Sequence, residues 1–302
     1  MLLFPATLRM TFRLLFCAGG WSALSLAAAT VDATRLEAAR ALYLERGKSA
    51  EAQKAFEAIA AEDPKNASAQ LHLGLLALRR DDAEKAKPYV EQALQLAPND
   101  AEMHRVMGDI YGRQAQKASI FSQPGLAKKC LAEYERAVAL DPRNIDAHAS
   151  LFEFYRRAPG IMGGGEDKAL ATAATIKRLD PTRGRIAFAT FYVEDKKYDQ
   201  AFAQFEEVLR TTPEDYAALY QIGRIAAVSG QQLDRGLASL RRCLALPVPA
   251  GLNTPGHAAA QWRIGNILEK KGDTAGARAA YNAALKLDPN FTAATEALKK
   301  LK

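Results

Sequence analysis

Histidine and cysteine side chains, which often act as metal ligands or nucleophiles, are few in this sequence and far apart. The histidines are His72, His104, His148 and His257, and the cysteines are Cys17, Cys130 and Cys243. A metal site requires several ligands that converge on one ion, and these scattered positions show no such spacing. Three cysteines are also too few for a disulfide scaffold. We therefore predict no metal site and expect Cys130 and Cys243 to be buried free thiols.

Motifs with a known catalytic mechanism are absent. The sequence has no G-x-S-x-G, H-E-x-x-H, C-x-x-C or Walker A pattern. A glycine cluster at residues 160–165 resembles a phosphate-binding loop, but Glu166 and Asp167 follow it directly. These acidic residues satisfy the amide groups at the start of a helix that a phosphate would otherwise need. The cluster therefore indicates a turn, and we predict no catalytic residue, no enzymatic activity and no cofactor.

Composition and charge narrow the class of protein further. Of the 302 residues, 49% are hydrophobic and 25% are charged, which excludes a disordered or collagen-like chain. Length alone suggests about two domains of ~150 residues. Abundant Ala, Leu, Glu, Lys and Arg favour helices. The net charge is +7, but bases and acids alternate without a basic run, so we expect no nucleic-acid partner.

The first 29 residues have the pattern of an export signal. Arg9 and Arg13 precede an apolar stretch from Leu14 to Leu26, and a run of three alanines ends at Ala29. A basic start, a short apolar run and small residues are typical of a cleavable secretory signal. We predict cleavage after Ala29, a periplasmic or secreted protein, and no membrane insertion after cleavage. An uncleaved anchor is the alternative, whereas Phe16 disfavours lipidation of Cys17.

Proline residues recur at a regular interval through the rest of the chain. They are Pro64, Pro98, Pro142, Pro181, Pro213, Pro247 and Pro289, at intervals of 34, 44, 39, 32, 34 and 42 residues. A base period near 34 with a few insertions indicates a helical repeat array. Proline disfavours the α conformation of the residue before it, so each one is expected to follow the end of a helix.

Small and large residues recur within these blocks as well. Residues 67–98 contain Leu73, Gly74, Ala86, Ala93 and Pro98, and residues 258–289 contain Ile264, Gly265, Ala277, Tyr281, Ala284 and Pro289. In this pattern the sequence resembles the tetratricopeptide repeat family over residues 33–302. The resemblance implies an all-α, right-handed α-α superhelix of about seven helix pairs.

The predicted organisation is a signal peptide at 1–29 and a solenoid at 30–302. The repeats are placed at 33–64, 67–98, 101–142, 145–181, 182–213, 216–247 and 258–289, with a capping helix at 290–302. Small residues such as Gly74 and Ala86 should allow close approach of paired helices. Aromatic residues such as Tyr134 and Tyr281 should fill the gaps to the next repeat. The insertion 112–125 should lengthen the end of the first helix of the third repeat and the turn to its second helix, and the insertion 159–165 should replace a short turn in the fourth repeat.

The resemblance also implies where a partner would bind, because certain positions of each first helix line a concave groove in this family. Carried over, they predict partner-binding residues His72, Arg105, Asp109, Arg156, Tyr220, Arg224, Trp262, Arg263 and Asn266; Glu153 and Arg157 fall at such positions too. Trp, Tyr and Arg dominate binding hot spots, so Tyr220, Arg224 and Trp262 are the expected anchors. Packing of Trp262 into the core is the alternative.

The family's carboxylate clamp, which holds the C-termini of chaperones, is not expected here. Its positions in the first three repeats hold Glu37, Ala41, His72, Glu102 and Val106. We therefore predict a non-catalytic scaffold that binds a peptide or protein segment in its groove. The alternative is an accessory subunit of a periplasmic transport or envelope-assembly system, such as a ring that handles a solute or cargo. The sequence leaves the partner, the process and the oligomeric state open.

Overall fold

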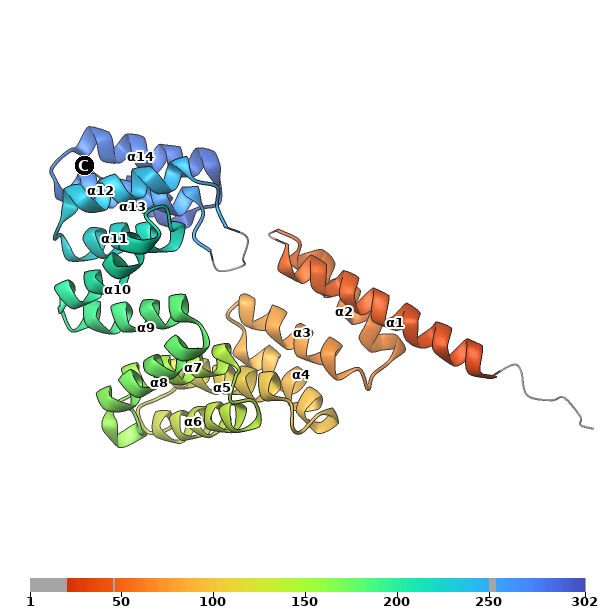
Figure 1. The fold of residues 1–302 in the computed structure, drawn as a ribbon. Coiled ribbons are helices and arrows are strands. Elements are labelled where there is room, and N and C mark those ends of the chain that lie inside the picture. The colour runs from red at the N-terminus through yellow and green to blue at the C-terminus, as the bar shows by residue number, and fades with distance from the viewer. Residues whose placement is uncertain (1–20, 46, 250–253, 302) are drawn as a thin grey trace, which may run out of the picture. The chain divides into compact units, whose positions relative to one another are not determined.

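A computed structural model describes residues 21–45, 47–249 and 254–301, and this part of the chain is all α-helical (Figure 1). Cys17 and most of the predicted signal lie outside the described residues. The chain divides into two compact units, residues 1–69 and 70–302. Fold class is thus as the sequence predicts, an α-helical solenoid without strands in the described ranges.

Helices in the first unit are α1 (Trp21–Leu44) and α2 (Ser49–Glu62), which pack against each other. Helix α1 begins well before residue 33, where the first repeat is predicted to start, and runs through the predicted cleavage position. An ion pair between Arg35 and Glu62 links α1 to the last residue of α2. The boundary between the units falls inside α3 (Ala67–Arg79).

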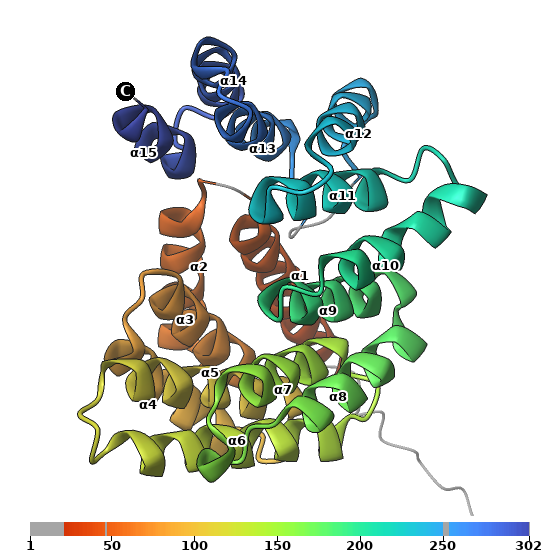
Figure 2. The same ribbon diagram turned by 90° about the vertical axis from the view of Figure 1, so that its left-hand side faces the viewer.

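The second unit continues from α3 as a run of helices in which neighbours along the chain pack together. They are α4 (Ala83–Leu96), α5 (Ala101–Lys117), α6 (Gln123–Leu140), α7 (Ile145–Arg157), η1 (Gly160–Met162), α8 (Glu166–Leu179), α9 (Pro181–Glu194), α10 (Tyr198–Thr211), α11 (Tyr216–Ser229), α12 (Leu233–Ala245), α13 (His257–Lys270), α14 (Thr274–Leu287) and α15 (Thr292–Lys300). The first helices of successive pairs also touch, as α5 with α7 and α11 with α13 (Figure 2).

Each of the seven periodic prolines follows the end of a helix, as predicted. Helices α2, α4, α6, α8, α10, α12 and α14 each stop two residues before one. Several of the helices that follow start from a polar cap: Asp100, Asn144 and Asp215 accept hydrogen bonds from backbone N–H groups three residues ahead. Such caps satisfy amides that the first helical turn leaves unpaired. The repeat boundary is therefore encoded by two or three adjacent residues.

Glycines mark where the two helices of a pair come closest. A Cβ atom on Gly74 would lie 2.5 Å from Val90 of α4 and 3.3 Å from the carbonyl oxygen of Ala86, as expected for a close approach. In the third and seventh pairs, a Cβ on Gly108 or Gly265 would lie within 2.5 Å of the ring of Tyr134 or Tyr281. These two rings thus pack within their own pair, which corrects the prediction that they only fill the gap to the next repeat.

Both insertions alter the turns of their repeats. Residues 112–117 extend α5, and α6 begins at Gln123, so the first insertion lengthens the paired helices more than the turn between them. The second forms η1 and a glycine turn in which Gly163 has φ +96° and a Cβ on Gly164 would collide with the Ala158 carbonyl. Only glycine fits both positions, which explains the cluster without a phosphate.

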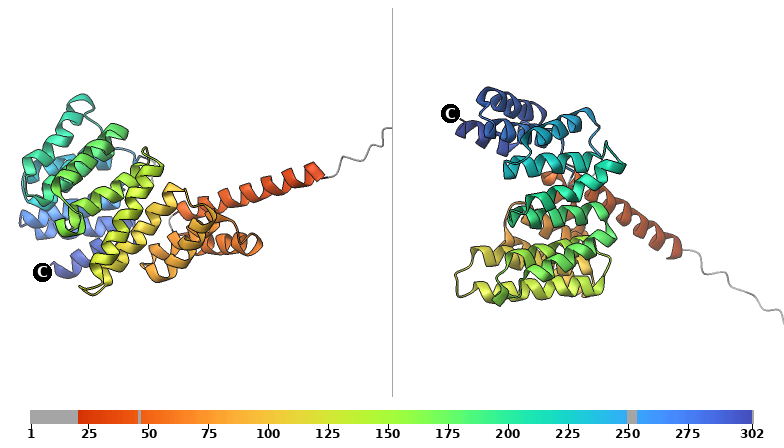
Figure 3. Two further views of the ribbon diagram at one scale, coloured as in Figure 1. Left: turned by 90° about the horizontal axis from the view of Figure 1, so that it is seen from below. Right: turned by 60° about the vertical axis from the view of Figure 1, so that its left-hand side comes forward.

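Helices α9 to α14 contribute to a large apolar cluster centred on α11, which buries Leu219, Ile222 and Ile225 completely. At the end of the chain, α15 packs against α14 and covers Tyr281 and Ala284 with Ala294 (Figure 3). Its exposed side carries Lys299 and Lys300. None of the helices within the described ranges has the length and hydropathy needed to cross a membrane.

Candidate binding site

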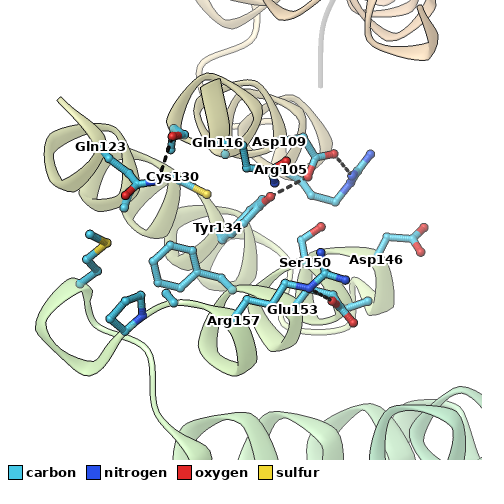
Figure 4. Close-up of a pocket in the computed structure, with 18 residues that line it drawn as sticks. Arg105, Asp109, Gln116, Gln123, Cys130, Tyr134, Asp146, Ser150, Glu153 and Arg157 are labelled. Atoms are coloured by element: carbon cyan, nitrogen blue, oxygen red, sulfur yellow. Dashed lines mark hydrogen bonds and ion pairs between the residues drawn. The ribbon is translucent and has the colours of Figure 1, made fainter. Parts of the chain in front are cut away.

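A pocket of about 780 Å³ lies between α5, α6, α7 and η1, all within the second unit (Figure 4). We call it the α5–α7 pocket. Its lining residues are Arg105, Asp109, Gly112, Ala115, Gln116, Gln123, Ala127, Cys130, Tyr134, Asp146, Ala149, Ser150, Glu153, Phe154, Arg157, Ala158, Pro159 and Met162. Both insertions contribute to this lining, so the departures from the 34-residue period build the cavity.

The charged end of the pocket is organised by Arg105, one of the predicted partner-binding residues. Its guanidinium donates to Asp109 Oδ2 at 2.7 Å and, through Nε, to Glu102 Oε2 at 2.7 Å. Burial lowers the pKa of Arg105, but the bonds to Glu102 and the charge of Asp109 outweigh this and raise it above its ordinary value. The arginine is therefore a fixed cation in a network of carboxylates.

Tyr134 connects this charged end to the apolar part of the lining near Cys130. Its hydroxyl donates to Asp109 Oδ1 at 2.7 Å, and the side chain is 7% exposed. Burial and the adjacent Asp109 carboxylate raise the pKa of Tyr134, so the phenol stays protonated and acts as a donor. Asp109 is thus held from two sides, and its orientation is set by α5 and α6 together.

The opposite end of the pocket is less polar. Figure 4 shows Gln123 and Cys130 at the end away from Arg105 and Asp146. Gln123 Nε2 donates to the Ala115 carbonyl at 3.2 Å, and Cys130 is a buried free thiol whose pKa burial raises to about 12. A thiol with so high a pKa is a poor nucleophile, which fits a packing role.

On α7, the neighbouring residues Arg156 and Arg157 have different environments. The Arg156 side chain is 4% exposed and pairs with Glu153 at 2.5 Å and with Glu194 of α9. It is therefore engaged in joining two helices, although the sequence predicts it as a partner-binding residue. Arg157 is 67% exposed, bonds Glu153 at 3.1 Å and lines the pocket. It is the better placed of the two for a ligand.

The expected anchors of the last two repeats are mostly packed within the fold. Tyr220 is 5% exposed in the core cluster, and Trp262 packs edge-on against Phe291, the residue just before α15, with ring centroids 5.9 Å apart. Trp262 is half-buried, and its ring packs against the cluster that contains Tyr281, which is the alternative named from the sequence. Asn266 Nδ2 donates to the Tyr281 hydroxyl at 2.9 Å.

Arg224 and Arg263 lie on the adjacent helices α11 and α13. Arg224 Nε donates to Gln221 Oε1 at 2.6 Å, and the Arg263 guanidinium lies 4.0 Å from the centre of the Trp262 ring. His72 is half-buried on α3. The predicted residues therefore fall into separate places: Arg105 and Asp109 meet in the pocket, and the others do not join them.

The histidines and cysteines pack as the sequence indicates. His148 is 7% exposed, and its Nε2 lies 3.0 Å from the Pro142 carbonyl; His104 makes the same contact with Pro98 at 3.0 Å and faces Glu133 at 2.6 Å. Cys243 is a buried free thiol. Within the part of the chain that the structure describes, no group of three or more potential ligands is placed to hold a metal ion.

Comparison with models of known protein families identifies the repeat. A model described as tetratricopeptide repeat matches residues 43–110, and a second one of the same description matches residues 186–242 and 225–290. The chain belongs to the tetratricopeptide repeat (TPR) family. The TPR assignment supports a scaffold for protein interactions.

Relatives and solved structures agree with the TPR assignment. The chain is 27% identical over 169 residues to human DnaJ homolog subfamily C member 7, covering 55% of this chain and 34% of that protein. It thus spans about a third of that relative's length. Among solved structures, a TPR protein of Parabacteroides merdae matches with TM-score 0.59 and 16% identity, covering 89% and 97% of the two chains. Yeast Tom70 matches with TM-score 0.63 and 17% identity, covering 84% and 51%. At these identities the likeness shows the TPR fold.

Several lining residues of this TPR pocket were not singled out from the sequence. Tyr134 and Phe154 form its aromatic surface, while Ser150 and Met162 lie on the facing elements α7 and η1. The available signal was the position of the two insertions, since residues inserted into adjacent repeats must meet on the same side of the stack.

Proposed function

We propose that this TPR protein is a non-catalytic scaffold that binds a segment of a partner protein in the α5–α7 pocket. The pocket carries the proposal because it combines an aromatic surface with charged groups that already hold one another in place. An apolar side chain of the partner would enter between Tyr134 and Phe154. Asp146, Ser150 and Arg157 would contact its main chain or flanking polar groups, and preorganisation would limit the entropy lost on binding.

The surroundings of the pocket support a protein ligand. The two insertions carry Phe121 and Ile161, each 89% exposed. Ile120, next to Phe121, is 76% exposed as well, and neighbouring apolar side chains exposed together are typical of contact surfaces for other proteins. The surface offered to the partner would therefore extend beyond the cavity, over the turns at residues 118–122 and 160–162.

A peptide library tests the proposal even though the partner is unidentified. Twelve-residue peptides displayed on phage would be selected on the purified protein, and selected peptides would be titrated against variants. Ser150→Trp fills the pocket and should weaken binding at least tenfold. Ala174→Trp, at an exposed position of α8, is the matched control and should bind as wild type does. Equal affinity of both variants would exclude the pocket as the peptide site.

We propose further that the protein is exported. The support is the arrangement of residues 1–29, with two bases, an apolar run and an Ala-Ala-Ala site. Expression in a Gram-negative bacterium followed by fractionation and N-terminal sequencing tests it. A periplasmic protein that begins at Thr30 is expected. A protein that retains Met1 and remains in the soluble cytoplasm would refute the export signal.

A second candidate function is the handling of a small solute as part of a transport or envelope-assembly system. Its support is the pocket volume of about 780 Å³, which falls in the range of about 300–1,000 Å³ usual for small-ligand sites. Native mass spectrometry and light scattering distinguish the two candidates. A co-purified small molecule or a stable ring of several chains would favour solute handling, and a ligand-free monomer would favour the scaffold.

A further inference from the structure

Arg224 and Arg263 form a pair of cations with unsatisfied hydrogen-bond donors on the adjacent helices α11 and α13. Arg224 Nη2 and Arg263 Nε are both buried and have no hydrogen-bond partner. The side-chain oxygen of Gln221 accepts a hydrogen bond from Arg224 Nε. The Arg263 guanidinium makes a cation–π contact with the Trp262 ring. Buried charged donors normally have partners, since leaving them unpaired destabilises the fold.

Electrostatics at this pair is repulsive. Burial lowers the pKa of Arg224, and the positive charge of Arg263 lowers it further; the only group that acts in the opposite direction is Tyr220. No carboxylate contributes to this balance among the described residues. Two guanidinium groups on adjacent helices thus repel each other in a partly desolvated place, with no compensating anion in the part of the chain that the structure describes.

Two arginines on earlier first helices have acidic partners. Arg105 is paired with Glu102 and Asp109, and Arg156 is paired with Glu153 and Glu194. The Nε atoms of Arg156 and of Arg185 on α9 are also buried without a hydrogen-bond partner, so an unpaired donor alone does not mark a site. At Arg224 and Arg263, two such cations lie on adjacent helices. Neither Arg224 nor Arg263 forms an ion pair within the described ranges, although direct packing brings α11 and α13 together.

We propose that Arg224 and Arg263 bind a doubly charged oxyanion, either a phosphate group or a pair of carboxylates. Guanidinium groups match oxyanions in charge and in the geometry of their donors. A dianion would neutralise both cations, whereas a single carboxylate would leave one positive charge uncompensated. This site is separate from the α5–α7 pocket, so a test of anion binding here is independent of the test of the proposed function.

Titration with simple anions tests the site. Inorganic phosphate, malonate, acetate and chloride would be added to the full chain at matched ionic strength, with binding measured by calorimetry and by the melting temperature. Phosphate or malonate should bind and raise the melting temperature, whereas acetate and chloride should not. Tighter binding of phosphate would identify a phosphate ligand, and tighter binding of malonate a dicarboxylate. Equal effects of all four anions would overturn the proposal.

Variants separate the pair from the general surface charge. Arg224→Lys and Arg263→Lys keep the charge but lose the forked donors, and each should weaken dianion binding at least tenfold. Arg241→Gln removes an exposed cation of α12 and should bind as wild type does. In the absence of dianion, Arg224→Met should melt no lower than wild type, because it removes the repulsion. Wild-type affinity in both lysine variants, or a large loss of stability in Arg224→Met, would contradict the proposal.

Discussion

At the scale of single residues, the glycines of the first helices decide how closely a pair can pack. A tyrosine ring from the second helix packs directly against Gly108 and against Gly265. The hydroxyl of that tyrosine is hydrogen-bonded to the residue after the glycine, Asp109 or Asn266. The same device therefore builds the polar end of the pocket in the third pair and stabilises the last pair. A side chain at the glycine would displace the ring and its hydrogen bond together.

Gly108→Ala should lower the free energy of unfolding by about 1–3 kcal/mol, because its Cβ would lie 2.5 Å from carbons of the Tyr134 ring. Urea unfolding followed by circular dichroism measures the change. Gly125→Ala is the matched control, since no atom lies within 4 Å of its Cβ position. A control variant that loses as much stability as Gly108→Ala would show that the ring contact does not explain the result, because alanine in place of glycine inside a helix is otherwise stabilising.

The thiols of Cys130 and Cys243 should be inert in the folded protein. Burial raises the pKa of each to about 12, so the thiolate fraction at pH 8 is about one in ten thousand. Iodoacetamide at pH 8, followed by peptide mass spectrometry, should label neither residue until guanidinium unfolds the chain. Labelling of either cysteine in native protein at the rate of a free thiol would contradict this burial.

At the scale of elements, proline and a polar cap together define where one repeat ends and the next begins. Pro213 follows α10 by two residues, and Asp215 accepts a hydrogen bond from the Ala218 N–H at 2.7 Å as α11 starts. Comparable caps begin α5, α7 and α9. Because each cap acts on one helix end, its loss should affect stability locally and moderately.

Asp215→Ala should lower the free energy of unfolding by about 1 kcal/mol, since it removes the acceptor for an amide of the first turn of α11. Asp215→Asn retains an acceptor and should stay close to wild type. Thermal unfolding of the two variants side by side gives the comparison. A similar loss for both would indicate that the charge, rather than the capping hydrogen bond, matters at this position.

At the scale of the whole molecule, stability is unevenly distributed along the repeats. Ten of the fourteen residues of α11 are buried, whereas α15 buries one of nine. Each repeat contacts its neighbours, and a helix with neighbours on both sides requires a larger opening before its amides meet water. The part of the second unit around α11 is therefore expected to be the most resistant to local unfolding.

Hydrogen exchange followed by mass spectrometry should show the slowest exchange in α11 and faster exchange in α15. The order follows from burial, because α11 packs against α9, α10, α12 and α13. A stabilising dianion at Arg224 and Arg263 should slow exchange in α11 and α13 further. Exchange in α15 as slow as in α11 would contradict this distribution.

The sequence by itself determined the helical period, the ends of the helices and the close contacts, because these depend on the local conformational limits of proline, glycine and polar caps. Tertiary structure decided which side chains are free to bind. By their positions in the repeat, Trp262 and Arg156 are expected to face the groove. In the structure, however, Trp262 packs against Phe291, and Arg156 forms an ion pair with Glu194. Those contacts come from other parts of the chain, as do the walls of the α5–α7 pocket. Stacking likewise leaves Arg224 without an acidic partner among the described residues. A periodic sequence pattern indicates how each helix packs, but only the stacking of the repeats decides which side chains from different helices come into contact.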